Sequence, residues 1–205
     1  MALKDLMQNT ISSQNMTTNE SVFGNESEIR LLVCGSRDFA RSDGDDQEEL
    51  IRAHRQGLTI EYHLRMFPNI GKLIHGAAQG ADRTAATIAR FKLRMAGDNI
   101  ISFPADWQRY GRAAGPIRNT QMLDEGRPNR VLAFFTNVSS SRGTLNMVNQ
   151  SLKRGLKVKC IDWVSMKIFY ATAIVENPID WMSLITNKED IIGTQSAIWN
   201  DGFDR

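Results

Sequence analysis

Three glycine-bearing polar segments contain the residue types that bind anions. The first is Gly35-Ser-Arg-Asp38, in which the glycine permits a sharp turn. The hydroxyl of Ser36 and nearby backbone N–H groups can hold a phosphate, and Arg37 can pair with it through two parallel hydrogen bonds. An ordinary turn explains so short a segment equally well, so the sequence leaves both interpretations open.

The second segment runs from His75 to Arg83. Gly76 and Gly80 allow the backbone to come close to a ligand, and Ala81 opens a helix whose positive end faces that position. Asp82 lies in the first turn of this helix, where it either contacts the ligand or stabilises the helix dipole. His75 has no second His or Cys at metal-ligand spacing, so no metal is expected.

The third segment is Ser139-Ser-Ser-Arg-Gly-Thr144, directly before an apolar helical pattern. Its serine and threonine hydroxyls and its arginine would form an anion cradle at a helix N-terminus, from residues Ser141, Arg142, Gly143 and Thr144. The alternative is a flexible serine-rich loop with Thr144 as a helix cap. The chain has neither Gly-x-x-x-x-Gly-Lys-Ser/Thr nor Gly-x-Gly-x-x-Gly, which excludes a Walker-type ATPase and the usual dinucleotide fingerprint.

Short apolar runs precede these segments and alternate with helical patterns. Strands are expected over residues 29–34, 72–75, 99–103, 131–135 and 157–161, and helices over residues 45–66, 81–95, 116–124 and 143–155. Such alternation predicts a Rossmann-like, doubly wound α/β fold with a mainly parallel sheet of about five or more strands. Ligands of such sheets bind beyond the carboxyl ends of the strands, where the three segments should converge.

Two extensions flank this predicted domain of residues 29–161. Residues 1–28 form a polar N-terminal extension, and residues 162–205 are expected to be a helical C-terminal extension. Ile161-Asp-Trp-Val-Ser165 is echoed by Ile179-Asp-Trp-Met-Ser183, which predicts two helices that each begin with Asp as N-cap. We expect this appendage to cover an edge of the sheet or an oligomer contact.

The charge of the chain is uneven along its length. The net charge is only +2, yet residues 52–159 carry 18 basic and 6 acidic residues, while both flanks are acidic. A basic centre favours an anionic ligand, either a small phosphate-bearing molecule or a nucleic acid. The two cysteines lie in apolar runs, and no apolar run approaches the roughly 18 residues of a membrane span, so a cytoplasmic protein without membrane contact is expected.

Six blocks in a fixed order resemble one family of nucleotide-binding domains. They are Leu32-Val-Cys-Gly-Ser-Arg-Asp-Phe39, His75-Gly-Ala-Ala-Gln-Gly-Ala-Asp82, Pro104-Ala-Asp-Trp107, Tyr110-Gly111, Ala114-Gly-Pro-Ile-Arg-Asn119 with Met122, and Ser141-Arg-Gly-Thr144. Together they resemble the YspA-type, YpsA-related branch of the SLOG superfamily, which also includes the Smf/DprA and lonely-guy proteins. The resemblance covers about residues 30–161.

The resemblance implies binding of a nucleotide or nucleotide-derived signal, as a sensor, carrier or sequestering protein of bacterial or phage conflict systems. The implied ligand-binding residues are Gly35, Ser36, Arg37, His75, Gly76, Gly80, Ala81, Asp82, Trp107, Arg118, Asn119, Ser141, Arg142, Gly143 and Thr144. No cofactor is implied, and relatives of this type lead us to expect a homo-oligomer.

Two alternatives follow from better known relatives. Lonely-guy enzymes cleave the N-glycosidic bond of nucleotides, and Arg118 with Met122 resembles their arginine element. Their glutamate falls on Met147, so a phosphoribohydrolase-like enzyme would need another carboxylate, for which Asp106 is the best candidate beside Arg118. Smf/DprA proteins bind single-stranded DNA, which the basic centre would also allow, although Trp107 and Tyr110 are the only clear stacking aromatics in the loops.

Overall fold

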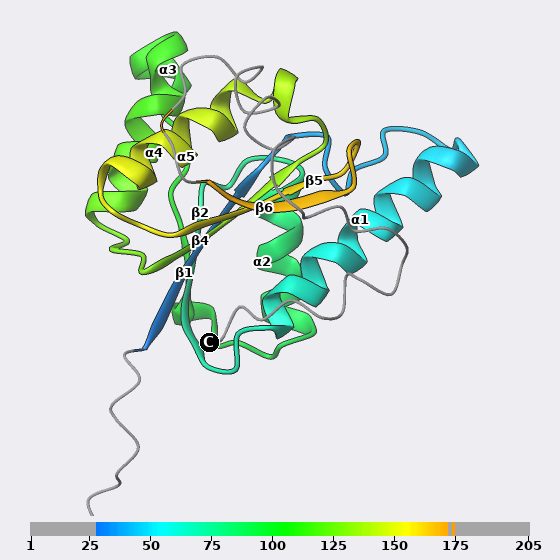
Figure 1. Ribbon diagram of the computed structural model, residues 1–205, viewed down its shortest axis with the longest axis horizontal. Coiled ribbons are helices and arrows are strands. Elements are labelled where there is room, and N and C mark those ends of the chain that lie inside the picture. Colours follow the sequence, from blue (N-terminus) through cyan, green and yellow to red (C-terminus); the bar gives the residue numbers. More distant parts are fainter. Residues whose placement is uncertain (1–27, 172–173, 175–205) are drawn as a thin grey trace, which may run out of the picture.

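The chain folds around a six-stranded sheet, seen in a computed structural model that describes residues 28–171 and 174 (Figure 1). The strands are β1 (Ile29–Gly35), β2 (Ile70–His75), β3 (Ile100–Ser102), β4 (Arg130–Phe135), β5 (Val158–Asp162) and β6 (Lys167–Ala171). Their order is β3-β2-β1-β4-β5-β6; the first five are parallel and β6 runs antiparallel to β5. The predicted α/β fold with a mainly parallel sheet is therefore confirmed.

Helices connect the parallel strands. They are α1 (Gln47–Arg65), α2 (Ala81–Phe91), α3 (Trp107–Tyr110), α4 (Ala114–Asp124) and α5 (Arg142–Lys153), with short 3₁₀ turns η1 (Gly97–Asn99), η2 (Gly111–Ala113) and η3 (Val138–Ser140). Asp46 begins α1 by accepting a hydrogen bond from the N–H of Glu48, as expected of an N-cap. In the described part of the chain, no helix is both long and apolar enough to cross a bilayer.

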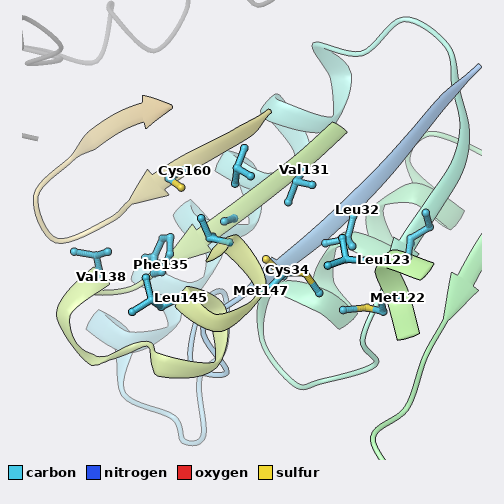
Figure 2. Close-up of a cluster of buried hydrophobic side chains, with 14 of the residues drawn as sticks. Leu32, Cys34, Met122, Leu123, Val131, Phe135, Val138, Leu145, Met147 and Cys160 are labelled. Atoms are coloured by element: carbon cyan, nitrogen blue, oxygen red, sulfur yellow. The ribbon is translucent and has the colours of Figure 1, made fainter. Parts of the chain in front are cut away.

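The sheet has a hydrophobic core on each face. Side chains alternate along β1, so Leu31 and Val33 pack with residues of α1 and α2 on one face. Leu32 and Cys34 pack with residues of α4 and α5 on the other, the cluster drawn in Figure 2. Because both faces are covered, the buried stretches Leu31–Cys34 of β1 and Val131–Phe135 of β4 are apolar without interruption.

The residues after β5 form a turn and a strand, where a helix beginning at Asp162 was expected. Asp162 is the last residue of β5, and its carboxylate accepts hydrogen bonds from the N–H groups of Val138 at 3.0 Å and Ser165 at 3.2 Å. The side chain thus caps a turn instead of a helix, and the β-branched and aromatic run of β6 pairs back onto β5. The predicted helix at Ile179–Ser183 lies outside the described residues.

Helix α2 is shorter than its apolar spacing predicts. It ends at Phe91, and the chain turns back so that the N–H of Leu93 reaches the carbonyl of Ile88. Arg94 adopts a left-handed backbone with φ of 56°, which stops further helix growth. Phe91, the last residue of α2, is 71% exposed and does not belong to the core face.

A buried histidine on α1 makes the stability of the fold sensitive to acid. His63 is buried against the rings of Tyr62 and Phe134, and neither of its ring nitrogens has a hydrogen-bond partner among the described residues. Burial, with a smaller effect from Lys159, lowers the pKa of His63 from 6.5 to about 3. Between those values the unfolded chain binds the extra proton, so His63 stabilises the fold above pH 6.5 and this stabilisation is lost as the pH falls toward 3.

We expect His63→Leu to remove this acid sensitivity. Each pH unit below 6.5 should cost the unmodified chain up to about 1.4 kcal/mol that the variant retains, or roughly 2.7 kcal/mol at pH 4.5. At pH 7 the variant should be at least as stable, because no hydrogen bond of the ring is lost. Urea unfolding of both proteins at pH 7 and 4.5 measures how much stability each one loses on acidification. Comparing the two losses cancels the contribution of other groups, such as Asp82, whose raised pKa favours the fold at low pH. Equal losses of stability in both proteins would contradict this role of His63.

Candidate functional site

A cavity of about 650 Å³ opens at the carboxyl end of the sheet, where β1 and β4 lie side by side and the chain order reverses. We call it the main cavity. Its walls come from the loops after β1, β2 and β4 and from α3, η2, α4 and α5, through residues Cys34–Asp38, Ala78, Asp82, Trp107, Arg112, Gly115, Pro116, Arg118, Asn119, Met122, Ser140–Thr144, Asn146 and Met147. This is the position at which open α/β sheets bind ligands.

The loops after β1 and β2 meet in a close backbone contact that only glycine allows. Gly80 has a φ of 78°, and a Cβ there would press against the carbonyl carbon of Arg37 at 2.6 Å. Gly35 is equally crowded, since its Cβ would lie 2.5 Å from the Cβ of Ala81. The N–H of Ala81 donates to the carbonyl of Ser36 at 3.3 Å, which ties the start of α2 to the first loop. Gly80 and Ala81 therefore shape the site without lining the cavity.

Arg118 lies on α4 and connects the loop after β2 with the start of α5, which follows β4. Its Nη1 donates to the carbonyl of Gly76, and its Nε donates to Oδ1 of Asn119 at 3.1 Å. Asn119 in turn donates to the carbonyl of Gly143 at 3.3 Å and to Oδ1 of Asn146 at 3.0 Å. This chain of contacts fixes the guanidinium in the cavity wall with its side chain only 14% exposed.

Asp82 is buried beneath the second loop and holds it in shape. One carboxylate oxygen accepts a hydrogen bond from the N–H of Gly76 at 2.8 Å and lies 3.9 Å from Nη1 of Arg118. Burial raises the pKa of Asp82 to about 6, against the opposing effects of Arg118 and backbone donors. Asp82 therefore holds the loop after β2 and also lines the main cavity, while its predicted contact with a ligand stays a prediction.

His75, at the end of β2, supports the loop after that strand and does not line the main cavity. Its Nδ1 accepts a hydrogen bond from the N–H of Ala77 at 3.2 Å, which requires an unprotonated nitrogen. Burial, together with the charge of Arg118, lowers the pKa of His75 to about 4. The ring is therefore neutral at physiological pH and acts as a structural acceptor.

Two hydroxyl groups, one from the loop after β1 and one from the loop after β4, meet at the main cavity. The Oγ atoms of Ser36 and Ser141 are 2.5 Å apart, and Ser36 Oγ accepts a hydrogen bond from the N–H of Thr136 at 3.1 Å. Ser141 begins α5, whose first turn contains Gly143 and Thr144. The N-terminus of this 12-residue helix and the adjoining hydroxyls therefore face the same cavity, as an anion cradle requires.

Sulfur-containing side chains form the apolar floor of the main cavity. Cys34 of β1, Met122 of α4 and Met147 of α5 belong to the buried cluster of Figure 2 and also line the cavity. Burial raises the pKa of the Cys34 thiol far above its usual range, so the group is an uncharged wall. Met147 is fully buried, so its thioether belongs to the same uncharged wall.

A second cavity of about 240 Å³ adjoins the main one, between the loops after β2 and β3. We call it the side cavity. It shares Arg37, Ala78, Trp107 and Arg118 with the main cavity and is otherwise lined by Gly76, Ala77, Gln79, Pro104 and Ala105. The shared residues form the boundary between the two spaces.

Trp107 stands at this boundary, half exposed, with the guanidinium of Arg37 stacked over its ring at 5.3 Å from the centroid. The neighbouring Asp106 is exposed and caps α3 by accepting a hydrogen bond from the N–H of Arg109 at 2.9 Å. Asp106 lines neither of the two cavities, so its geometry does not support the catalytic role considered for it.

Most of the residues expected at the site do converge there. The main cavity or the side cavity is lined by Gly35, Ser36, Arg37, Gly76, Asp82, Trp107, Arg118, Asn119, Ser141, Arg142, Gly143 and Thr144. Asn146 also lines the main cavity, although no loop motif predicts it. In the sequence only its position, one turn after the start of α5, points to the site. Within residues 28–171 and 174, no three His, Cys, Asp or Glu side chains gather as a metal site would need.

Comparison with known proteins identifies a phage relative. No family model matches the chain. The gene 61 protein of Mycobacterium phage D29 is 34% identical to it over 88 residues, which is 42% of this chain and 67% of the relative. The similarity is distant but covers most of the shorter protein. The chain, an α/β protein with a Rossmann-like sheet, belongs to the same family as this gene 61 protein.

Proposed function

We propose that the protein binds a nucleotide or nucleotide-derived anion at the carboxyl edge of its sheet, as a SLOG-type sensor, carrier or sequestering protein. The observation that carries this proposal is the main cavity, which four arginines line: Arg37, Arg112, Arg118 and Arg142. Only Asp38 and Asp82 oppose them in the lining, and Asp82 already forms an ion pair with Arg118 at 3.9 Å. An anionic ligand would relieve this excess of positive charge.

The lining divides into surfaces suited to the parts of a nucleotide. Arginines and the first turn of α5 would hold phosphate oxygens. The apolar floor of Cys34, Met122 and Met147 would pack against the base or ribose, as the mainly apolar walls of small-molecule sites do. A volume of about 650 Å³ lies within the range of such sites, which is roughly 300–1,000 Å³.

Binding without turnover fits the lining better than hydrolysis does. Cleavage of an N-glycosidic bond builds positive charge on the ribose, which a nearby carboxylate must stabilise. Met147 offers none, Asp82 is committed to the loop at Gly76, and Asp38 accepts a hydrogen bond from the Thr136 hydroxyl at 2.9 Å. Incubation with nucleoside monophosphates should therefore release no free base, and steady release would favour the enzyme.

Thermal unfolding with a panel of nucleotides tests the proposal. A ligand at 100 times its dissociation constant should add about 2.7 kcal/mol of stability. For a domain of this size that raises the melting temperature by roughly 5–10 °C. The matching control is inorganic sulfate at equal ionic strength, which should have a much smaller effect. A panel of nucleotides without any shift would refute the proposal.

Single-stranded DNA is the competing anionic partner. The exposed aromatics near the cavity, Trp107 and Tyr110, each carry an arginine over the ring, which is a limited stacking surface. An oligonucleotide that bound more tightly than mononucleotides, with steep weakening as salt rises, would favour this alternative over the small-molecule site.

A further inference from the structure

The distribution of charge between the two cavities suggests what kind of nucleotide the site takes. Beyond the shared boundary, the main cavity contains four charged residues, Arg112, Arg142, Asp38 and Asp82. Beyond the same boundary, the side cavity is lined only by uncharged residues, namely Gly76, Ala77, Gln79, Pro104 and Ala105. The uncharged part of the side cavity offers a phosphate no charge to pair with, so it would bind poorly there. A neutral polar group loses less hydration energy on burial and is better suited to this space.

The boundary itself is cationic. Arg37 and Arg118 line both cavities, so an anionic group placed between them would face the main cavity on one side and the side cavity on the other. The side cavity, at about 240 Å³, is below the roughly 300 Å³ typical of an independent small-molecule site. It therefore has the size of a subsite for part of a larger ligand.

The walls of the side cavity are held in a defined shape. Ala77 has a left-handed backbone with φ of 55°, an unfavourable conformation for alanine, and Arg83 Nε donates to its carbonyl at 3.3 Å. Arg41 donates to the side-chain oxygen of Gln79. With that oxygen engaged, the group that Gln79 offers to a ligand is its amide N–H₂, a donor for hydroxyl or ether oxygens.

From these observations we infer that the ligand has two parts joined by a phosphate or pyrophosphate. Its nucleoside occupies the main cavity, its anionic linker lies between Arg37 and Arg118, and an uncharged, hydroxyl-bearing group about the size of a sugar fills the side cavity. This inference rests on the proposed function and narrows it to nucleotides that carry a second, neutral group.

Calorimetric titrations of the full chain test the inference with paired probes. Each of ADP, GDP and UDP is compared with a sugar-bearing form, namely ADP-ribose, GDP-mannose and UDP-glucose. At least one sugar-bearing form should bind about 10-fold or more tighter than its diphosphate, the gain from roughly one or two added hydrogen bonds.

Two variants locate the gain in the side cavity. Ala105→Leu should obstruct that cavity, and Gln79→Ala should remove its amide donor, so both should abolish the preference and leave the diphosphate affinity as it was. Ala113→Leu, an exposed position that lines neither cavity, is the matched control and should keep the preference. Equal affinities for each diphosphate and its sugar-bearing form would overturn this inference alone, as would an unchanged preference in both variants. Absence of all nucleotide binding would instead refute the proposed function.

Discussion

Asp82→Ala is expected to lower the free energy of unfolding by about 3–5 kcal/mol, the cost of breaking a buried ion pair from one side. Asp82 is 2% exposed, and its loss would leave the N–H of Gly76 without its acceptor and the guanidinium of Arg118 without its ion-pair partner. Since single domains are stable by only about 5–15 kcal/mol, such a loss would be prominent in urea unfolding at pH 7.5.

Asp82→Asn is the informative partner of this variant. The amide oxygen of Asn can still accept the hydrogen bond from the N–H of Gly76. The variant also avoids the cost of burying a charge, the cost that raises the pKa of Asp82. We therefore expect a loss of only about 1–2 kcal/mol, in the range of a weakened hydrogen bond. An alanine variant as stable as the unmodified chain would show that Asp82 does not hold the loop.

Arg118→Gln is expected to weaken nucleotide binding by about 100-fold, which corresponds to roughly 2.7 kcal/mol. Arg118 lines both cavities, and its guanidinium is oriented by Asn119 and by the carbonyl of Gly76 before any ligand arrives. Arg118→Lys should restore only part of the affinity, because an ammonium keeps the charge but cannot pair with a phosphate through two parallel bonds.

Titration calorimetry with the best nucleotide of the thermal panel provides this measurement. Arg55→Gln removes the same charge from an exposed site on α1 that lines neither cavity, so its affinity should remain within about threefold of the unmodified chain, as expected of a screened distant charge. If Arg55→Gln and Arg118→Gln weaken binding equally, only the overall charge of the protein matters, and the cavity has no specific role.

The sheet and most of its loops were accessible to sequence reasoning because their signals are local. A short apolar run followed by Gly35 or Gly76 identifies a buried strand and its exit, and parallel strands bring their carboxyl ends to one edge. That is why residues as distant in sequence as Ser36 and Ser141 could be expected at one site, where their hydroxyls are in contact.

The errors arose where tertiary contacts outweigh local preference. Asp162 resembles a helix cap in sequence, but its carboxylate is engaged by Val138, which lies 24 residues earlier in another loop. The side cavity was equally hidden, because Ala77 and Ala105 carry no chemical signal and gain significance only when the loops after β2 and β3 meet. The positive φ of Ala77 could not be inferred from an alanine.

The most direct test of nucleotide binding at the carboxyl edge is a crystal structure of the full chain with a nucleoside diphosphate at millimolar concentration. The phosphates should lie within hydrogen-bonding distance of Arg37 and Arg118, with the nucleoside over the floor formed by Cys34, Met122 and Met147. A nucleotide bound at any other surface, with the main cavity filled only by solvent, would contradict the account.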